Sequence, residues 1–74
     1  MPRTKVDIIG YRYRQINDFI RGELRRQKIP QIKLAEYLGI SQAALSLRLN
    51  GTNEWPLRDF LETMEFLKQP LEIL

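Results

Sequence analysis

The fold is decided by the segment QIKLAEYLGISQAALSLRLNG, which spans residues 31–51. Apolar residues at 34, 35 and 38 follow the spacing of one helix face, and those at 45 and 49 follow the spacing of a second. Between these two short helices, Gly39 supplies the left-handed backbone position that ends a helix, and Ser41 is a good N-cap for the next one. The segment therefore predicts a helix-turn-helix.

The corner between the two helices explains most of the residue choices. Helices that meet at a steep angle need a small side chain at their closest approach, and Ala35 supplies it. The space beneath is expected to be filled by Leu34, Leu38, Ile40, Leu45 and Leu49, which leaves Gln42, Ala43, Ser46 and Leu47 pointing outward. Gln42 can offer a donor and an acceptor side by side, which matches the N6 and N7 edge of adenine in the major groove.

These residues carry a resemblance to a known family. Gln31, Leu34-Ala35, Leu38-Gly39-Ile40, Ser41-Gln42, Leu45 and Leu49-Asn50-Gly51 resemble the helix-turn-helix of the lambda repressor and Cro (XRE-type) superfamily, which consists of small phage and bacterial transcription regulators. The resemblance implies an all-α fold, a compact bundle of four to five short helices. It also implies a homodimer that binds operator DNA, with residues 42–49 in the major groove.

The resemblance also implies roles for individual residues. Gln31 and Gln42 sit where the phage repressors place an amide pair, one touching a phosphate and the other a base. The residues expected to read bases are Gln42, Ala43, Ser46, Leu47 and Asn53, and those expected to bind phosphates are Gln31, Lys33, Asn50, Arg48, Arg12 and Arg14. Two positions depart from the family, because Ile32 and Leu47 are apolar where polar residues are usual.

Length and composition narrow the class of protein. We expect a single domain over residues 1–74, with a flexible arm at 1–5 and a tail at 68–74. The chain has no Cys and no His, so no thiolate or imidazole metal site and no disulfide are expected. We find no base and nucleophile at plausible spacing and no phosphate-binding glycine loop, so we expect neither an enzyme nor a cofactor. No signal peptide or membrane span is recognised, and a cytoplasmic location is expected, in a bacterial or phage-infected cell.

The net charge of +3 is unevenly distributed along the chain. Residues 1–30 hold eight basic and three acidic residues, residues 31–53 hold two and one, and residues 54–74 hold two and five. The basic N-terminal part suits a phosphate backbone, whereas the acidic C-terminal part suits a surface turned away from DNA or toward another protein.

The N-terminal third predicts one helix, beginning at either Lys5 or Tyr11 because Gly10 leaves the start open. Its apolar stripe is Tyr13, Ile16, Ile20 and Leu24, widened by Phe19 and extended backward by Ile9 if the helix starts early. Pro30 cannot continue this helix, so the break is expected at Lys28 to Pro30. Ile32 and Tyr37 fit the next helix poorly and predict either partial burial or a protein-contact patch.

A fourth helix is predicted after the loop that ends at Trp55, with Pro56 as its first residue and Leu57, Phe60, Leu61, Met64 and Leu67 packed inward. Trp55 either plugs the core, the interpretation we favour, or anchors a partner chain. Phe66 lies off the stripe. The apolar tail residues Leu71, Ile73 and Leu74 either fold back over the first helix or pair with a second copy, and we favour a dimer to which Phe66 and Trp55 contribute.

Two functions of different classes are consistent with these features. The first is a sequence-specific regulator that binds double-stranded DNA as a dimer. The second is a protein-binding module of the same fold, an antirepressor or antitoxin that occupies a repressor or toxin. Salt dependence of DNA binding separates them, because only the first should lose affinity steeply as salt rises.

Overall fold

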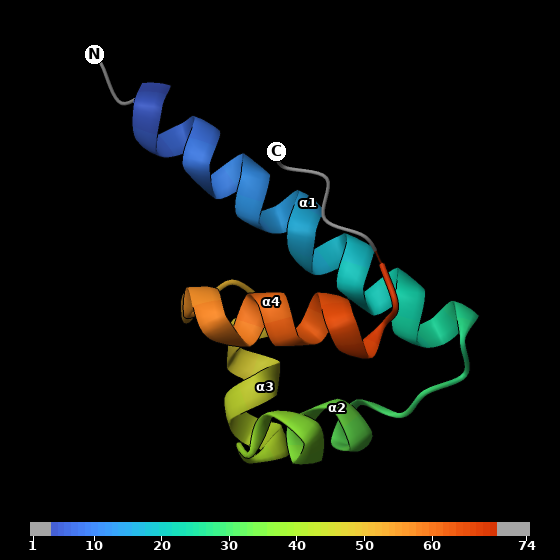
Figure 1. Ribbon diagram of the computed structural model, residues 1–74. Coiled ribbons are helices and arrows are strands. Elements are labelled where there is room, and N and C mark those ends of the chain that lie inside the picture. Colours follow the sequence, from blue (N-terminus) through green and yellow to red (C-terminus); the bar gives the residue numbers. More distant parts are fainter. Residues whose placement is uncertain (1–3, 70–74) are drawn as a thin grey trace.

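The structure is a computed structural model that describes the backbone of residues 4–69 and the side chains of residues 8–69. This part of the chain forms α1 (Thr4–Arg26), α2 (Gln31–Leu38), α3 (Gln42–Leu49) and α4 (Leu57–Phe66), and it contains no strand, so the predicted all-α class is confirmed. Figure 1 shows the long α1 running across one side of the molecule, with α4 beneath it and α2 and α3 beyond. Within the described residues, no helix has both the length and the apolar character needed to cross a membrane.

Helix α1 is continuous from Thr4, through Gly10, to Arg26. The earlier of the two predicted starts is therefore the better one, and the prediction of an arm at 1–5 is wrong for Thr4 and Lys5; residues 1–3 lie outside the described part. After α1 the chain turns at Lys28, which has a φ of 60°, and the Ile29 N–H donates to the Leu24 carbonyl at 2.8 Å. The predicted break before Pro30 is confirmed.

The corner between α2 and α3 is built as the residue types predict. Gly39 has a φ of 75°, and its N–H donates to the Glu36 carbonyl at 3.1 Å. Ser41 caps α3, because its Oγ accepts the Ala44 N–H at 3.0 Å. A side chain larger than hydrogen would strain the left-handed position, so glycine is needed at 39.

The core lies where α1, α2, α3 and α4 meet. Its buried apolar residues are Ile20, Leu24, Leu34, Ala35, Leu45, Leu49, Trp55, Met64 and Leu67, and the partly buried Leu38 and Ile40 pack against it. This confirms the inward positions predicted for α2 and α3. Each fully buried leucine or isoleucine stabilises the fold by about 1.5–3 kcal/mol relative to an exposed one.

The apolar stripe of α1 is narrower than predicted. Ile20 and Leu24 are buried and Tyr13 and Ile16 are partly buried, but Ile9 and Phe19 are exposed. The core face of α1 includes the polar Asn17, which is 2% exposed and whose side chain has a hydrogen-bond partner there.

Helix α4 is rotated relative to the prediction. Phe60, Thr63, Met64 and Leu67, spaced 3, 1 and 3, form its inward side, whereas Leu57 is 71% exposed and Leu61 42% exposed. Thr63 can be fully buried because its hydroxyl donates to the Asp59 carbonyl at 2.8 Å. Pro56 lies just before the helix in extended conformation rather than inside it.

Candidate nucleic-acid interface

The outer face of α3 is formed by Gln42, Ala43, Ser46 and Leu47, all of which are exposed. Leu45 and Leu49 of the same helix are buried. Ala43 and Leu47 lie on the side away from them, and Gln42 is exposed as the first residue of the helix. None of the hydrogen bonds among residues 8–69 involves the Gln42 side chain, so its amide is available to a ligand or to water. The structure therefore brings together four of the five residues predicted to read bases, on one side of one short helix.

Four side chains from three helices and a loop hold α3 at its C-terminal end. They are Asn17 of α1, Arg48 of α3, Asp59 of α4 and the indole of Trp55, and we call them the anchoring cluster. The Trp55 Nε1–H donates to the Asn17 Oδ1 at 2.8 Å. The Arg48 guanidinium lies 5.4 Å from the centroid of the Trp55 ring and donates to the Asp59 Oδ2 at 2.7 Å. Because these contacts link α1, α3 and α4, they fix the direction in which α3 points.

The anchoring cluster corrects two predictions. Arg48 was expected to bind a phosphate, but its side chain is 14% exposed and is already paired with Asp59, so it contacts other helices instead. Trp55 was expected among the partner contacts, but its side chain is 7% exposed and is bonded to its own chain, so the core-plug alternative is the correct one.

Arg21 is a contact that the sequence analysis missed. Its Nη2 donates to the Leu49 carbonyl, one of the last carbonyls of α3, and its Nη1 pairs with Asp18 at 3.1 Å. The final carbonyls of a helix have no partner within the helix, so an arginine from a neighbouring helix is a suitable donor. No local signal in the sequence indicates this contact, because its donor and acceptor are 28 residues apart.

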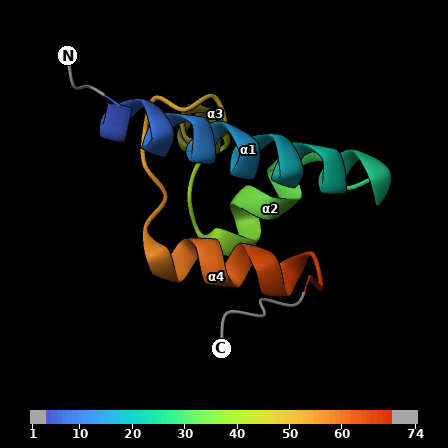
Figure 2. The ribbon, with the colours of Figure 1, turned by 90° about the horizontal axis from the view of Figure 1, so that it is seen from above.

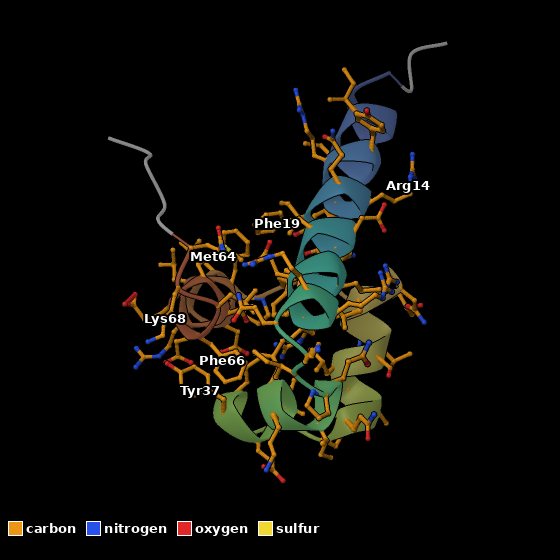
Figure 3. All side chains as sticks on the ribbon, turned by 90° about the vertical axis from the view of Figure 1, so that its right-hand side faces the viewer. Arg14, Phe19, Tyr37, Met64, Phe66 and Lys68 are labelled. Carbon is orange, nitrogen blue, oxygen red and sulfur yellow. The ribbon has the colours of Figure 1, made fainter. Side chains whose placement is uncertain are left out.

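The predicted phosphate-binding arginines lie on different sides of α1. Arg14 lines a groove between α1 and the loop after α3, together with Asn50 and Asn53. Arg12, two residues earlier, is about 200° away around the helix, and its Nη1 donates to the Gln15 Oε1 at 3.3 Å. Figure 3 shows Arg14 on the side of α1 away from α4. The structure thus brings Arg14, but not Arg12, near the other candidate residues.

Asn50 stabilises the loop that follows α3. The Asn50 Oδ1 accepts the Thr52 N–H at 3.0 Å, and Gly51 has a φ of 88°. The Thr52 and Asn53 N–H groups also donate to the Leu47 carbonyl, at 2.9 and 3.1 Å. This arrangement uses the oxygen of the exposed Asn50 amide, while its NH2 group has no hydrogen-bond acceptor among the described residues and can serve as a donor.

The start of α2 carries the two remaining candidates. Pro30 is at the N-cap position and supplies no side-chain hydrogen bond, so the first amides of α2 are left for water or an anion. Gln31 is half-buried and Lys33 is exposed, with its Nζ 3.9 Å from the Glu36 Oε1. Such an exposed pair is weak, so Lys33 can exchange Glu36 for another anion.

Of the remaining predicted partner contacts, Phe66 belongs to the described residues and the tail residues do not. Phe66 is half-buried, and its ring centroid lies 4.8 Å from that of Tyr37 in the same chain. This contact explains why Tyr37 and Phe66 do not follow the apolar stripes of their own helices. Figure 3 shows the two rings facing one another between α2 and α4. Phe66 is therefore mainly an internal contact. Leu71, Ile73 and Leu74 lie outside the described residues.

A second charged cluster lies at the C-terminal end of α1. The Glu23 carboxylate accepts hydrogen bonds from Arg26 at 2.7 Å, from Gln27 at 3.1 Å and from Gln69 at 3.1 Å. The Arg26 hydrogen bond, with help from Gln27, lowers the pKa of Glu23, and the same carboxylate raises the pKa of Arg26. Since Gln69 follows α4, this cluster ties the end of the described chain to α1.

The described side chains offer no other chemistry of comparable specificity. Among residues 8–69, no three acidic, His or Cys side chains gather closely enough to hold a metal ion. Comparisons with protein-family models, with curated proteins and with solved structures find no match to the chain. A functional interpretation therefore depends on the surface of α3 and its surroundings.

Proposed function

We propose that this protein is a sequence-specific regulator that binds double-stranded DNA as a dimer, in the manner of the lambda repressor and Cro family. In this proposal α2 and α3 form the helix-turn-helix, and α3 enters the major groove. One observation carries it: α3 exposes an amide at its first residue and small side chains on its outer face, while Leu45 and Leu49 of the same helix are buried in the core. A rigidly held helix with a slim outer face can approach base edges closely. Such a regulator would act in the bacterial cytoplasm.

Base reading is assigned mainly to Gln42. It is the first residue of α3, and in this motif the N-terminal residues of the second helix contact bases. Its amide can both donate and accept, as adenine requires. Ala43 and Ser46 add little bulk beside it, and the apolar Leu47 suits the methyl group of thymine.

Phosphate binding is assigned to residues on either side of α3. The start of α2 offers uncapped amides together with Gln31 and Lys33. At the other end of α3, the groove lined by Arg14, Asn50 and Asn53 offers a cation and two amides, and Glu54 adds one carboxylate to the same lining. Phosphates of a DNA strand flank the groove that a helix enters, so two such supports would fix the depth and direction of α3.

The proposal is tested by the variant Gln42→Ala on DNA selected by the wild-type protein from a random duplex library. Loss of a bidentate contact should cost about 1–3 kcal/mol on the preferred site and relax the preference at one base pair. Gln15→Ala, which removes an exposed amide from α1, is the matched control and should leave affinity unchanged. Unaltered selectivity of the Gln42→Ala variant would contradict the proposal.

A second test uses the two arginines on opposite sides of α1. Neutralising one phosphate contact should reduce the slope of log affinity against log salt by about 0.9. We expect this change for Arg14→Gln and no change for Arg12→Gln. Equal effects would show that attraction is set by total charge, and a flat salt dependence of the wild-type protein would favour the protein-binding alternative.

A further inference from the structure

We propose that the outer face of α4 binds a second copy of this chain, with the two α4 helices antiparallel and related by a two-fold axis beside Leu61. The proposal deepens the function proposed above by naming the surface through which the dimer forms. It rests on that function only for the dimer's role, since self-association can be measured without DNA.

The first observation is an apolar strip that no described element covers. Leu57 and Leu61 lie one turn apart on α4 and are both exposed, and Tyr37 of α2 is 49% exposed beside the same helix. With Arg58, Glu62 and Glu65 they line a shallow groove of about 500 Å³. Figure 2 shows α1 and α2 on one side of α4 only. This strip places three exposed apolar side chains side by side, as a contact surface for a partner requires.

The second observation is the arrangement of charge around the strip. Arg58 and Glu65 are seven residues apart and so face the same way on α4, with opposite signs. In an antiparallel pair, Arg58 of one copy lies opposite Glu65 of the other, and the symmetry creates this pairing twice. In a parallel pair, each charge would face its own like charge. Within one copy the Arg58 Nε lies 3.3 Å from the Glu62 Oε2, and this exposed pair is weak, so Arg58 can exchange Glu62 for Glu65 of the partner. The Arg58 and Glu65 positions are therefore complementary in the antiparallel orientation, as an isologous two-fold contact requires.

The same pairing locates the symmetry axis. If residue 58 lies opposite residue 65, the two-fold axis passes between Leu61 and Glu62. Leu61 of one copy then lies opposite Glu62 of the other, and both Leu61 side chains lie beside the axis. Leu57 then packs near the end of the partner's α4, beside the exposed Tyr37 that lines the same strip. A contact centred on a ten-residue helix is small, so we expect a dimer at the weak end of specific interfaces.

This dimer surface is separate from the face assigned to DNA. The strip lies on α4 and the neighbouring edge of α2, whereas Gln42, Ala43 and Ser46 belong to the outer face of α3. Two copies joined through α4 would therefore leave both α3 helices open. Occupying two major-groove segments on one DNA face requires those helices to lie about 34 Å apart.

The sharpest test is a cysteine placed at the axis, which is possible because the chain has none of its own. Under mild oxidation, Leu61→Cys should form a disulfide-linked dimer at least about tenfold faster than Leu47→Cys, because only residues at the axis are held within disulfide reach. Leu47, 40% exposed on α3, is a control of the same residue type and similar exposure. Equal rates for the two variants would overturn the proposal.

A charge exchange tests the orientation. By sedimentation equilibrium, Arg58→Glu and Glu65→Arg should each weaken dimerisation about tenfold, and the double variant should recover wild-type affinity because the pairs are restored with reversed sign. Arg58 is highly exposed, so these variants should fold, and circular dichroism checks that they do. A double variant no better than either single variant would overturn the antiparallel arrangement.

The remaining outcomes separate this proposal from the function proposed above. The α4 interface is overturned if the wild-type protein stays monomeric at millimolar concentration. It is also overturned if the dimer is lost in the triple variant Leu71→Ser, Ile73→Ser, Leu74→Ser but kept in Arg58→Glu. Both outcomes hold even if α3 reads DNA. A dimer that responds to the α4 substitutions supports the interface, even if Gln42→Ala leaves DNA selectivity unchanged and the proposed function fails.

Discussion

The two faces of α3 differ in what they contribute. Its inner face is buried through Leu45 and Leu49, and its C-terminal end contacts α1 and α4 through the anchoring cluster of Asn17, Arg48, Trp55 and Asp59. Its outer face contributes less to packing, because its four residues are exposed, although Leu47 is only 40% exposed. Contacts that stabilise the fold and side chains proposed to recognise DNA are therefore separated within one eight-residue helix. Substitutions on the two sides should therefore affect different measurements.

The largest effect is expected for Trp55→Ala. Truncation removes the buried indole, leaves the Asn17 carbonyl oxygen without its donor and uncovers the Arg48 guanidinium. Such a change should lower the free energy of unfolding by about 3–5 kcal/mol, which in a domain of this size removes most of the stability. Urea denaturation measures it, with Tyr11→Ala on the exposed surface of α1 as the aromatic control. A loss below about 1 kcal/mol would mean that the anchoring cluster does not hold the fold.

A smaller loss is expected for Arg48→Met. Methionine retains the apolar stem over the indole but leaves the Asp59 carboxylate, itself only partly exposed, without its partner. We expect the variant to lose about 1–3 kcal/mol of unfolding free energy. The double variant with Asp59→Asn should regain part of the loss, and a double-mutant cycle isolates the pair. If the two losses were simply additive, the ion pair would not contribute to the link between α3 and α4.

The opposite face should show almost no effect on stability. Leu47→Ala keeps a good helix former and removes only a side chain that is partly in solvent, so the free energy of unfolding should change by no more than about 0.5 kcal/mol. Affinity for the selected DNA should nevertheless fall, because Leu47 lies on the outer face of α3. A variant that lost stability and kept DNA affinity would reverse the division between the two faces.

The corner of α2 and α3 could be predicted from sequence because its signals are local. Gly39 is needed for a positive φ, Ser41 caps the amide three residues later, and the leucines repeat at helix spacing within eight residues. Each requirement involves residues that are neighbours along the chain. The structure therefore confirms their positions, and the outward direction of Ala43 and Leu47 follows from the inward direction of Leu45 and Leu49.

The anchoring cluster could not be predicted because its members are distant in sequence. The Trp55 indole and the Asn17 amide are 38 residues apart, and neither an asparagine within an apolar stripe nor an arginine on a predicted groove-facing helix indicates its partner. The rotation of α4 has the same cause. Leu57 and Leu61 satisfy the apolar pattern as well as Phe60 and Met64 do, and only packing against α1 and α2 decides which pair is buried.

The smallest expected effect concerns pH and a region far from α3. Hydrogen bonding to Arg26 and Gln27 lowers the pKa of Glu23 below its ordinary value of 4.5, so the ionised carboxylate is favoured by folding. This contribution is complete above the unfolded pKa and is lost as the pH falls below it, through the lower pKa of the folded state. Glu23→Gln should therefore be less stable than wild type at neutral pH, and the difference should shrink in acid as the wild-type carboxylate is protonated. Urea midpoints measured between pH 7 and pH 3 test this, with Glu36→Gln on exposed α2 as the control for net charge. A constant difference across that range would mean that Glu23 acts through its shape alone and that its charge does not help to tie Gln69 to α1.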